Sequence, residues 1–347
     1  MFVSNSAVVP AQDPTRAAGE TIHRRLRMLD GWRMVSILSV MAAHMLPLSP
    51  ARWQINYMIA ADGMAIFFTL SGFLIVSILL RDTDIPAFLV RRLARILPLA
   101  WLALGLSFLV QAQGPAVWLA NFLFYANLPP FYLVPSSSHF WSLGVEMQFY
   151  GAIALTVLVL GRRGLNLVPV AAIAVTILRI TTATPISIVT WYRVDEILAG
   201  GILAMIIHQP TGPWAQWLGR IPFWPVAILF LFSSHPGLVW LNYPRHYLAG
   251  AMVGITILRP IRGLSPLLES RPASYIAQIS YALYIIHHFA MFTTDGSPSK
   301  LIKYLWRPVQ IAATFTLAHF STFYFEKCFI DWSHNFARKR KLKLSAA

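Results

Sequence analysis

Arg33 and His44 are the residues whose types and spacing most directly predict chemistry. Both lie in the apolar segment 29–47, which also carries Asp30. An α-helix turns by about 100° and rises about 1.5 Å per residue, so His44 returns to within about 20° of Arg33, roughly 16 Å further along the axis. Ionisable groups are costly inside a bilayer and usually face a cavity or a partner. The shared face therefore predicts a functional site, unless Arg33 only snorkels to the interface and His44 caps the far end of the helix.

Glu146 is an acidic residue placed one to two helical turns inside the apolar segment 141–160. A carboxylate in this position needs a cationic partner, for which Arg33 or a protonated histidine is suited. Such a carboxylate can orient a histidine or move a proton, whereas a structural ion pair is the alternative. Ser142 lies four residues earlier and so on the same helical face. We predict that Glu146 serves the site and that Ser142 lines the cavity beside it.

Two further apolar segments carry polar residues with open roles. Ser71 and Gly72 lie in the middle of segment 57–80, where the pair either lets a neighbouring helix approach closely or lines a cavity. Asp195 and Glu196 are consecutive, and consecutive residues diverge by about 100° on a helix. They are therefore not expected to serve one site together. Asp195 is a candidate for lining the cavity and Glu196 for a local ion pair, with a structural role open for both.

His287 and His288 end an apolar run and lie next to each other. Adjacent helical residues point in different directions, and the H-E-x-x-H spacing of zinc sites is absent from the sequence. The single cysteine, Cys328, excludes both a cysteine-based metal site and an intrachain disulfide. We therefore expect no metal site, and we expect His287 to line the cavity.

Arg92 and Arg95 lie three residues apart in the segment 88–98 and so share a helical face. A pair of guanidinium groups at a helix start suits a phosphate, which arginine holds through bidentate hydrogen bonds. The alternative is that the pair marks the cytoplasmic side of the membrane and contacts lipid headgroups. The sequence has no glycine-rich phosphate loop, which disfavours an ATP-driven pump.

The composition is that of a membrane protein. Hydrophobic residues make up 57% of the chain and charged residues 12%, against about 45–50% and about 25% in ordinary globular domains. The formal net charge is +15, but the positive residues gather between apolar segments, which indicates cytoplasmic loops rather than a nucleic-acid surface. These clusters are Arg24, Arg25 and Arg27; Arg91, Arg92 and Arg95; Arg162 and Arg163; Arg259 and Arg262; and Arg338 to Lys343.

Apolar segments near the membrane-spanning length of about 20 residues recur along the chain. We predict an all-α, polytopic transmembrane helical bundle of about ten spans with both termini cytoplasmic, because this arrangement places the basic clusters inside. Segment 116–134 is apolar too, but it contains two consecutive prolines and many aromatic residues, and it is expected to be interfacial or re-entrant. The predicted spans are 29–47, 57–80, 96–112, 141–160, 165–180, 191–208, 221–234, 245–258, 276–293 and 308–326.

The same patterns divide the chain into three parts. Residues 1–28 are polar, lack the apolar core of a cleavable signal peptide, and are expected to form a disordered cytoplasmic amino end. Residues 29–326 are expected to form the membrane domain, and residues 327–347 a basic cytoplasmic tail. The sequence leaves the oligomeric state open.

Five motifs make the chain resemble the acyltransferase-3 family of bacterial membrane proteins. They are Leu29-Asp-Gly-Trp-Arg33 followed by His44, Phe67-Phe-Thr-Leu-Ser-Gly-Phe-Leu-Ile75, Arg91-Arg-Leu-Ala-Arg-Ile-Leu-Pro98, Trp141-Ser-Leu-Gly-Val-Glu-Met-Gln-Phe-Tyr150 and Ile279-Ser-Tyr-Ala-Leu-Tyr-Ile-Ile-His287. Each motif is weak alone, but the combination in this order is specific. The family typically has His-Trp-Pro after the last motif, where this chain has His-His-Phe.

The resemblance implies transfer of an acyl group, usually acetyl, to the sugars of surface polysaccharides, lipopolysaccharides, lipo-oligosaccharide signals or antibiotics. It implies that His44 and Arg33 belong to the catalytic centre, with Glu146 at the acidic position of the family. It also assigns Arg92 and Arg95 to the cytoplasmic donor side, to which we add Ser71 as a further donor-binding candidate. The residues predicted to line the cavity are Asp30, Ser142, Asp195, Tyr281 and His287.

The resulting hypothesis is a membrane-bound O-acyltransferase in the bacterial inner (cytoplasmic) membrane. It moves an acetyl or other short acyl group, not an aminoacyl group, from cytoplasmic acyl-CoA to a hydroxyl of a surface or exported glycan or lipid-linked oligosaccharide. Acetyl-CoA is then a donor substrate, no bound cofactor is expected, and His44 acts as general base or carries the acyl group. The partners are membrane lipids and not nucleic acid. The alternatives are a secondary transporter, which also needs ionisable residues in its spans, and a polysaccharide export partner without acyl-transfer activity.

Overall fold

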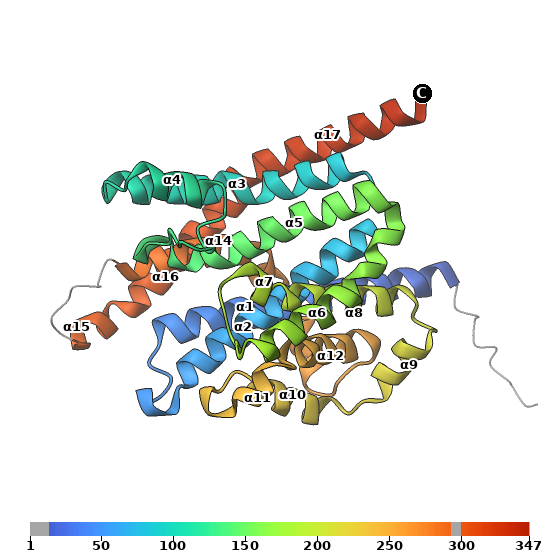
Figure 1. The fold of residues 1–347 in the computed structure, drawn as a ribbon, viewed down its shortest axis with the longest axis horizontal. Helices are drawn as coiled ribbons and strands as arrows, with labels where there is room; N and C mark the ends of the chain where they lie inside the picture. Colours follow the sequence, from blue (N-terminus) through green and yellow to red (C-terminus); the bar gives the residue numbers. More distant parts are fainter. Residues whose placement is uncertain (1–13, 293–299, 347) are drawn as a thin grey trace, which may run out of the picture.

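The protein is a bundle of helices, with no strand in the part of the chain that the structure describes. The structure is a computed structural model that describes residues 14–292 and 300–346 (Figure 1). The helices are α1 (Pro14–Met45), α2 (Ile55–Leu79), α3 (Ile85–Val110), α4 (Pro115–Phe122), α5 (Trp141–Leu160), α6 (Leu167–Thr181), α7 (Thr190–Arg193), α8 (Asp195–His208), α9 (Pro213–Arg220), α10 (Phe223–Phe232), α11 (Val239–Asn242), α12 (Arg245–Leu258), α13 (Leu264–Leu268), α14 (Arg271–Phe292), α15 (Lys300–Leu305), α16 (Arg307–Phe320) and α17 (Lys327–Ala346). Short 3-10 segments include η2 (Pro135–Phe140) and η3 (Gly161–Asn166), and the π-helical turn η5 (Ser321–Glu326) joins α16 to α17.

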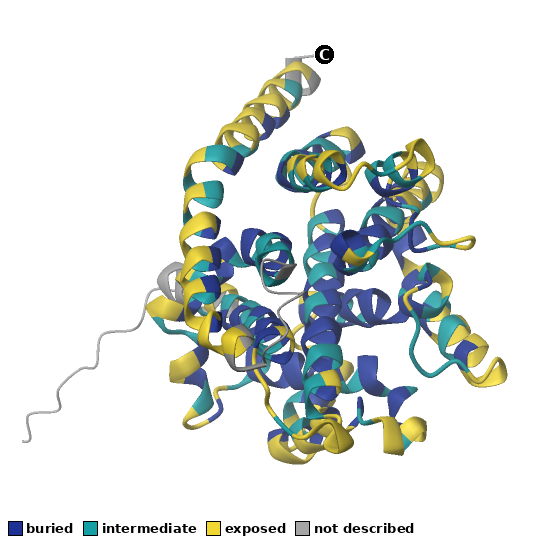
Figure 2. Ribbon diagram, turned by 90° about the vertical axis from the view of Figure 1, so that its left-hand side faces the viewer, coloured by how far each residue is buried: buried dark blue, intermediate teal, exposed yellow. Residues whose placement is uncertain are grey.

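The helix α2 lies near the centre of the bundle. It packs against α1 and α8, and α1 packs in turn against α14. Figure 2 shows buried residues gathered in the inner helices, while the outer helices are largely exposed. Many exposed side chains are large and apolar, including Leu106, Leu109 and Leu158. Such a surface is typical of helices that meet lipid rather than water.

The amino end differs from the prediction. The helix α1 begins at Pro14, so the helix extends through residues 14–28, which we expected to be disordered. This stretch contains four arginines and two alanines, which are good helix formers, and it continues directly into the apolar segment. Arg24 and Arg27 lie 3.7 and 3.9 Å from the carboxylate of Glu269. Residues 1–13 lie outside the described residues.

The predicted spans coincide with helices or with consecutive helices, within a few residues at most ends. By length and composition, three helical segments of the described chain are suited to cross a membrane: α2, α3 and the continuous stretch Pro135–Thr181. The consecutive helices α9 and α10 add a fourth if they form one span, bent by 83°. The helical, membrane-type architecture is thus confirmed, and the number of ten crossings and their orientation stay predictions.

Segment 116–134 does not form a spanning helix. Its only α-helix, α4, has eight residues, and a helix of this length is about 12 Å long, well short of the hydrocarbon thickness of about 30 Å. The remainder of the segment is irregular. This agrees with the expectation that the segment is not a span.

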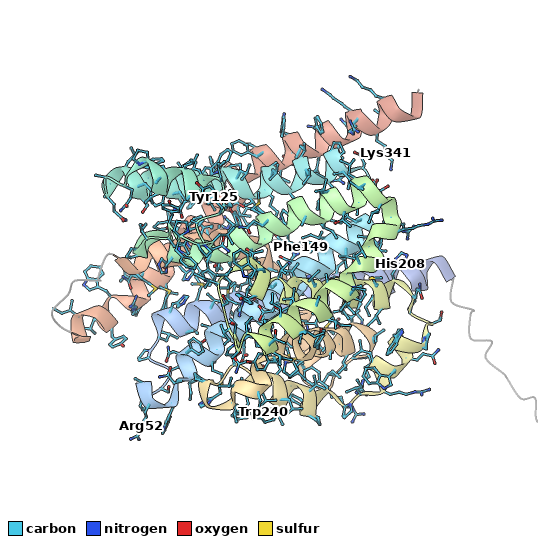
Figure 3. All side chains as sticks on the ribbon, viewed as in Figure 1. Arg52, Tyr125, Phe149, His208, Trp240 and Lys341 are labelled. Atoms are coloured by element: carbon cyan, nitrogen blue, oxygen red, sulfur yellow. The ribbon has the colours of Figure 1, made fainter. Side chains whose placement is uncertain are left out.

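The basic tail is a helix that lies along α3 (Figure 1). In α17, Arg340 donates through Nε to both carboxylate oxygens of Asp84, at 2.9 and 3.1 Å. Figure 3 shows Lys341 of this tail and His208 of α8 toward one end of the molecule and Arg52 toward the opposite end. This placement is consistent with the predicted orientation, in which Lys341 and His208 are cytoplasmic and Arg52 is not.

Close packing of α2 against α8 depends on two glycines. A Cβ atom at Gly72 would overlap the backbone carbonyl of Ile197, and a Cβ atom at Gly200 would overlap that of Thr69. The neighbouring atoms are backbone, which cannot move without displacing a helix. Of the two roles left open for the pair in α2, Gly72 therefore has the packing role, whereas Ser71 lines a cavity.

Replacement of Gly72 by alanine is expected to lower the free energy of unfolding by about 1–3 kcal/mol, as for other overpacked interiors. Gly151→Ala is the matched control, because no atom lies within 4 Å of a Cβ atom there and alanine is the better helix former. Thermal unfolding of the purified variants in detergent micelles measures both. Equal midpoints for the two variants would show that the α2–α8 contact tolerates a methyl group.

Candidate active site

Three cavities lie one after another through the bundle. We call them the inner, middle and outer cavities, following the predicted orientation of the chain. Their volumes are about 260, 80 and 720 Å³. The polar or aromatic residues of the inner cavity are Arg33, Phe88, Arg91, Arg92, Arg95 and His334; those of the middle cavity are Arg33, Ser36, Phe67, Ser71, Arg92, Arg95, Glu146, Tyr150, Ser280, Tyr281 and Tyr284; and those of the outer cavity are His44, Tyr57, Phe131, Ser138, His139, Trp141, Ser187, Arg193, Tyr284 and His288.

Adjacent cavities share walls. Arg33, Arg92 and Arg95 line both the inner and the middle cavity. Val40 and Tyr284 line both the middle and the outer cavity. The three cavities therefore form a series that leads from a cluster of arginines to a cluster of histidines.

One face of α1 follows the whole series. Arg33 lines the inner and middle cavities, Val40 the middle and outer cavities, and His44 the outer cavity. These residues are seven and four positions apart, which keeps them on one helical face. The structure thus places Arg33 and His44 on the shared face that the sequence predicts, and it places that face toward adjacent cavities rather than toward lipid.

Four histidines gather at the outer cavity. The Nδ1 atom of His44 lies 3.1 Å from Nε2 of His287. The ring of His139 lies 4.4 Å from that of His288 and 6.0 Å from that of His287, between ring centres. His44 is exposed, whereas His287 and His139 are buried. Among the described residues, no group of three or more His, Cys, Asp or Glu side chains is arranged to hold a metal ion.

Glu146 has its contacts in the middle cavity rather than at His44. Its Oε1 atom accepts hydrogen bonds from Ser71 Oγ at 2.5 Å and from Tyr150 Oη at 2.6 Å. The side chain that contacts the His44 ring is His287. The structure therefore brings Glu146 together with Arg33, Arg92 and Arg95, whereas the role of orienting a histidine is not what its contacts show.

Ser142 and Tyr281 support the walls of the cavities. Ser142 is completely buried and lies 2.6 Å from the hydroxyl of Tyr284, which itself donates to the backbone carbonyl of His139 at 2.6 Å. Tyr281 lines the middle cavity and donates to the backbone carbonyl of Ile96 at 2.6 Å. Ser142 thus contacts Tyr284, which forms part of the wall between the middle and outer cavities, and does not itself line either cavity.

The two aspartates predicted to line the cavity lie outside the three cavities. Asp30 is half-buried, 3.9 Å from the guanidinium of Arg33, and so accompanies that residue. Asp195 is buried between Arg179, which donates to its carboxylate, and His246, whose Nδ1 lies 3.2 Å away. Of the two roles left open for Asp195, the contacts favour the structural one.

Glu196 belongs to the same buried region and holds α8 to α12. Its Oε1 accepts from Nε and Nη2 of Arg245 at 3.0 and 2.6 Å, and its Oε2 lies 3.3 Å from Nε of Arg193. Arg245 also donates to Ser234 Oγ, which donates to Asp62 of α2. This network is an ion-pair cluster inside the bundle. It reaches the outer cavity at Arg193, which is one of the residues that line this cavity.

Some residues of the site were not found from the sequence. Tyr150 lies four positions after Glu146, so helical spacing was a signal that could have indicated their contact. His139 lies in the non-α segment η2, where no helical spacing applies. Arg193 is in the four-residue helix α7, and only the fold brings it to the cavity of His44.

Comparisons with known proteins identify the family. The acyltransferase-3 family model, described as an acyltransferase domain, matches residues 27–326. The peptidoglycan O-acetyltransferase OatA of Listeria monocytogenes is 25% identical over 84% of this chain and 54% of its own length. The putative peptidoglycan O-acetyltransferase YrhL of Bacillus subtilis is 26% identical over 88% of this chain and 55% of its own. A putative O-acetyltransferase of Staphylococcus aureus is 26% identical over 39% of this chain.

The chain spans a little over half the length of the first two relatives. No solved structure matches the chain. The family model covers residues 27–326, and this range includes all residues that line the middle and outer cavities. The chain therefore belongs to the acyltransferase-3 family.

Proposed function

We propose that the protein transfers a short acyl group, with acetyl as the first candidate, from acyl-CoA in the inner cavity to a hydroxyl of a glycan in the outer cavity. The observation that carries this proposal is the series of three cavities from the arginine cluster to the histidine cluster. The names of the relatives, which are O-acetyltransferases, support acyl transfer to a glycan. The enzyme would act as a multi-pass protein of the bacterial inner membrane.

The inner cavity has the charge that a CoA donor requires. Arg91, Arg92 and Arg95 of α3 and Arg33 of α1 line it, and none of the described acidic residues does. Guanidinium groups bind phosphate oxygens through paired, charge-assisted hydrogen bonds. The phosphates of acyl-CoA would therefore be held at this end, with the acyl-bearing arm directed toward the middle cavity.

The middle cavity limits what can pass. A free volume of about 80 Å³ holds a few water molecules, so a sugar ring does not fit between the inner and outer cavities. A thin chain such as the arm of acyl-CoA could enter once flexible side chains such as Met64 move aside. Donor and acceptor would then meet from opposite sides of the constriction, and Glu146 would fix Ser71 and Tyr150 along the path.

The outer cavity suits the acceptor and the reaction. Its volume of about 720 Å³ is large enough for sugar units, and Tyr57 and Trp141 offer aromatic faces. His44 is an exposed imidazole of this cavity, and an imidazole is the side chain that most often serves as a general base. We propose that His44 takes the proton of the acceptor hydroxyl as the oxygen attacks the thioester carbonyl.

Release of CoA by the purified protein tests the proposed function. The protein in detergent micelles is incubated with acetyl-CoA and with soluble peptidoglycan fragments, and free thiol is measured together with the mass of the glycan. The proposal predicts thiol release that depends on the glycan, with a matching gain of one acetyl group. A transporter or a non-catalytic export partner consumes no acetyl-CoA in this assay.

Replacement of Arg95 by glutamine is expected to raise the KM for acetyl-CoA by about 10- to 100-fold, because a hydrogen bond to a charged group contributes about 1.5–3 kcal/mol. The KM for the glycan should stay near the wild-type value, since Arg95 does not line the outer cavity. Arg163→Gln is the matched control: it makes the same change at an exposed arginine of another basic cluster. An unchanged KM for acetyl-CoA in Arg95→Gln argues against donor binding by this arginine.

A further inference from the structure

The contacts of His287 determine which of its nitrogens carries a proton. His287 is completely buried in α14. Its Nδ1 atom lies 2.8 Å from the backbone carbonyl oxygen of Tyr284 and 3.1 Å from that of Leu283. A carbonyl oxygen can only accept a hydrogen bond, so Nδ1 must be the protonated nitrogen. In a neutral imidazole the other nitrogen, Nε2, is then an acceptor.

The Nε2 atom of His287 faces His44 in a well-aligned geometry. It lies 3.1 Å from Nδ1 of His44. The two ring planes differ by 5°, and the ring centres are 5.4 Å apart. This separation exceeds the distance between the nitrogens by about one ring width, so both nitrogens lie close to the line that joins the ring centres. The hydrogen bond therefore runs within the common ring plane, along the lone pair of the acceptor.

The protonation of His44 follows from this geometry. Because Nε2 of His287 accepts, Nδ1 of His44 must donate and so carries the ring proton. The remaining nitrogen of His44, Nε2, then has a free lone pair. His44 is exposed and lines the outer cavity, whereas His287 is buried behind it. The basic nitrogen thus belongs to the ring that the acceptor can reach.

We propose that His287 is a positioning residue that holds His44 in its Nδ1–H tautomer and stabilises the imidazolium formed during the reaction. This proposal rests on the proposed function. In the step, Nε2 of His44 takes the proton of the acceptor hydroxyl, the new C–O bond forms and the C–S bond breaks. The proton then passes from Nε2 to the thiolate of CoA, so that ester and free thiol are the products.

Backbone carbonyl groups provide the partial negative charge at the buried end of this chain of hydrogen bonds. While His44 carries the transferred proton, its Nδ1–H stays bonded to His287, whose own Nδ1–H points at the carbonyl dipoles of Leu283 and Tyr284. In hydrolases with a Ser-His-Asp triad a carboxylate orients the catalytic histidine in the same way. Here a neutral histidine fixed by two carbonyl groups takes that place, and it does so without an ionised group buried behind the catalytic imidazole.

Two substitutions of His287 separate its hydrogen bond with His44 from its hydrogen bonds to the backbone carbonyl groups of Leu283 and Tyr284. The side-chain carbonyl of glutamine reaches as far as Nε2 of histidine and can accept from His44, whereas the shorter asparagine can replace only the Nδ1 contact. His287→Gln is expected to keep kcat within about tenfold of wild type. His287→Asn is expected to lose about 10²- to 10⁴-fold in kcat, the range for misaligned acid–base catalysis. The KM for acetyl-CoA should remain near wild type in both.

Nitrogen-15 NMR of the protein labelled at histidine tests the tautomer independently of activity. The expected signature in wild type is a protonated Nδ1 and an unprotonated Nε2 for His44, identified by the loss of that signal in His44→Gln. The signature should persist in His287→Gln and disappear in His287→Asn. His319→Asn is the control, because His319 lies on α16 and bonds to Tyr275, away from the three cavities.

Several results would overturn the proposal. A wild-type His44 protonated at Nε2 contradicts the tautomer directly, without any variant. Equal kcat values for His287→Asn and wild type contradict the positioning role. If wild type releases no CoA with any acceptor but shows the expected tautomer, the proposed function fails while the hydrogen bond between His44 and His287 stands, so the two failures are distinguishable.

Discussion

Replacement of His44 by alanine is expected to lower the rate of acyl transfer by about 10²- to 10⁴-fold, the usual contribution of a general base. The physical reason is that His44 is the exposed imidazole of the outer cavity, held by His287 with one nitrogen free. Without it, the acceptor hydroxyl must lose its proton to water. The measurement is glycan-dependent release of CoA by equal amounts of purified wild type and variant.

His208→Ala is the matched control for this prediction. His208 ends α8 at the opposite end of the molecule from Arg52 (Figure 3), and its bond to Arg162 is exposed. This control should retain the wild-type rate. The KM for acetyl-CoA of His44→Ala should be unchanged, because His44 does not line the inner cavity. Undiminished acetylation by His44→Ala at normal abundance would reject His44 as the reacting group.

Replacement of Arg245 by leucine is expected to lower the free energy of unfolding by about 3–5 kcal/mol, as when one partner of a buried ion pair is removed. Arg245 is 1% exposed and makes two hydrogen bonds to Glu196, which is also 1% exposed. The variant leaves the Glu196 carboxylate buried with Arg193 as its remaining cation, 3.3 Å away. Unfolding in micelles by heat or denaturant, followed by helix content, measures the loss.

The double variant Arg245→Leu/Glu196→Leu tests the cause. Because Arg193 still pairs with Glu196 in the single variant, removal of Glu196 as well leaves Arg193 buried without that carboxylate, and the double variant should be no more stable than Arg245→Leu. Arg162→Leu, at an exposed arginine, should change the stability by less than about 1 kcal/mol. A single variant as stable as wild type would show that Arg245 adds no net stability.

Local patterns in the sequence predicted the helices and the faces that matter. The apolar segments gave helices close to the expected positions, because a long apolar segment in a bilayer has no water to bond its backbone groups and satisfies them within a helix. The eleven-residue spacing of Arg33 and His44 put both on one face of α1, because a helix has a fixed period. The prediction of disorder was wrong for residues 14–28, which form the first half of α1. These residues are largely polar, so a search for apolar segments does not reveal that the helix begins before residue 29.

Partners across the bundle could not be predicted in this way. The sequence left open that Glu146 orients a histidine, but its contacts are Ser71 and Tyr150. The residue at His44 is His287, which is separated from it by 243 positions in the sequence. Which of two candidate side chains faces a given residue depends on the rotation and crossing of several helices, and these are set by packing such as the glycine contact of α2 with α8.

The sequence by itself determined that this is a helical membrane protein of the acyltransferase-3 family, with an arginine and a histidine on one helical face. These properties depend on residue type and on spacing within single segments. Only the tertiary structure decided that three neighbouring cavities lie between the arginines and the histidines, and that His287 is the side chain whose ring nitrogen lies beside that of His44. Cavities and proton positions depend on which side chains meet across helices, and that is a property of the packed bundle rather than of any one of its segments.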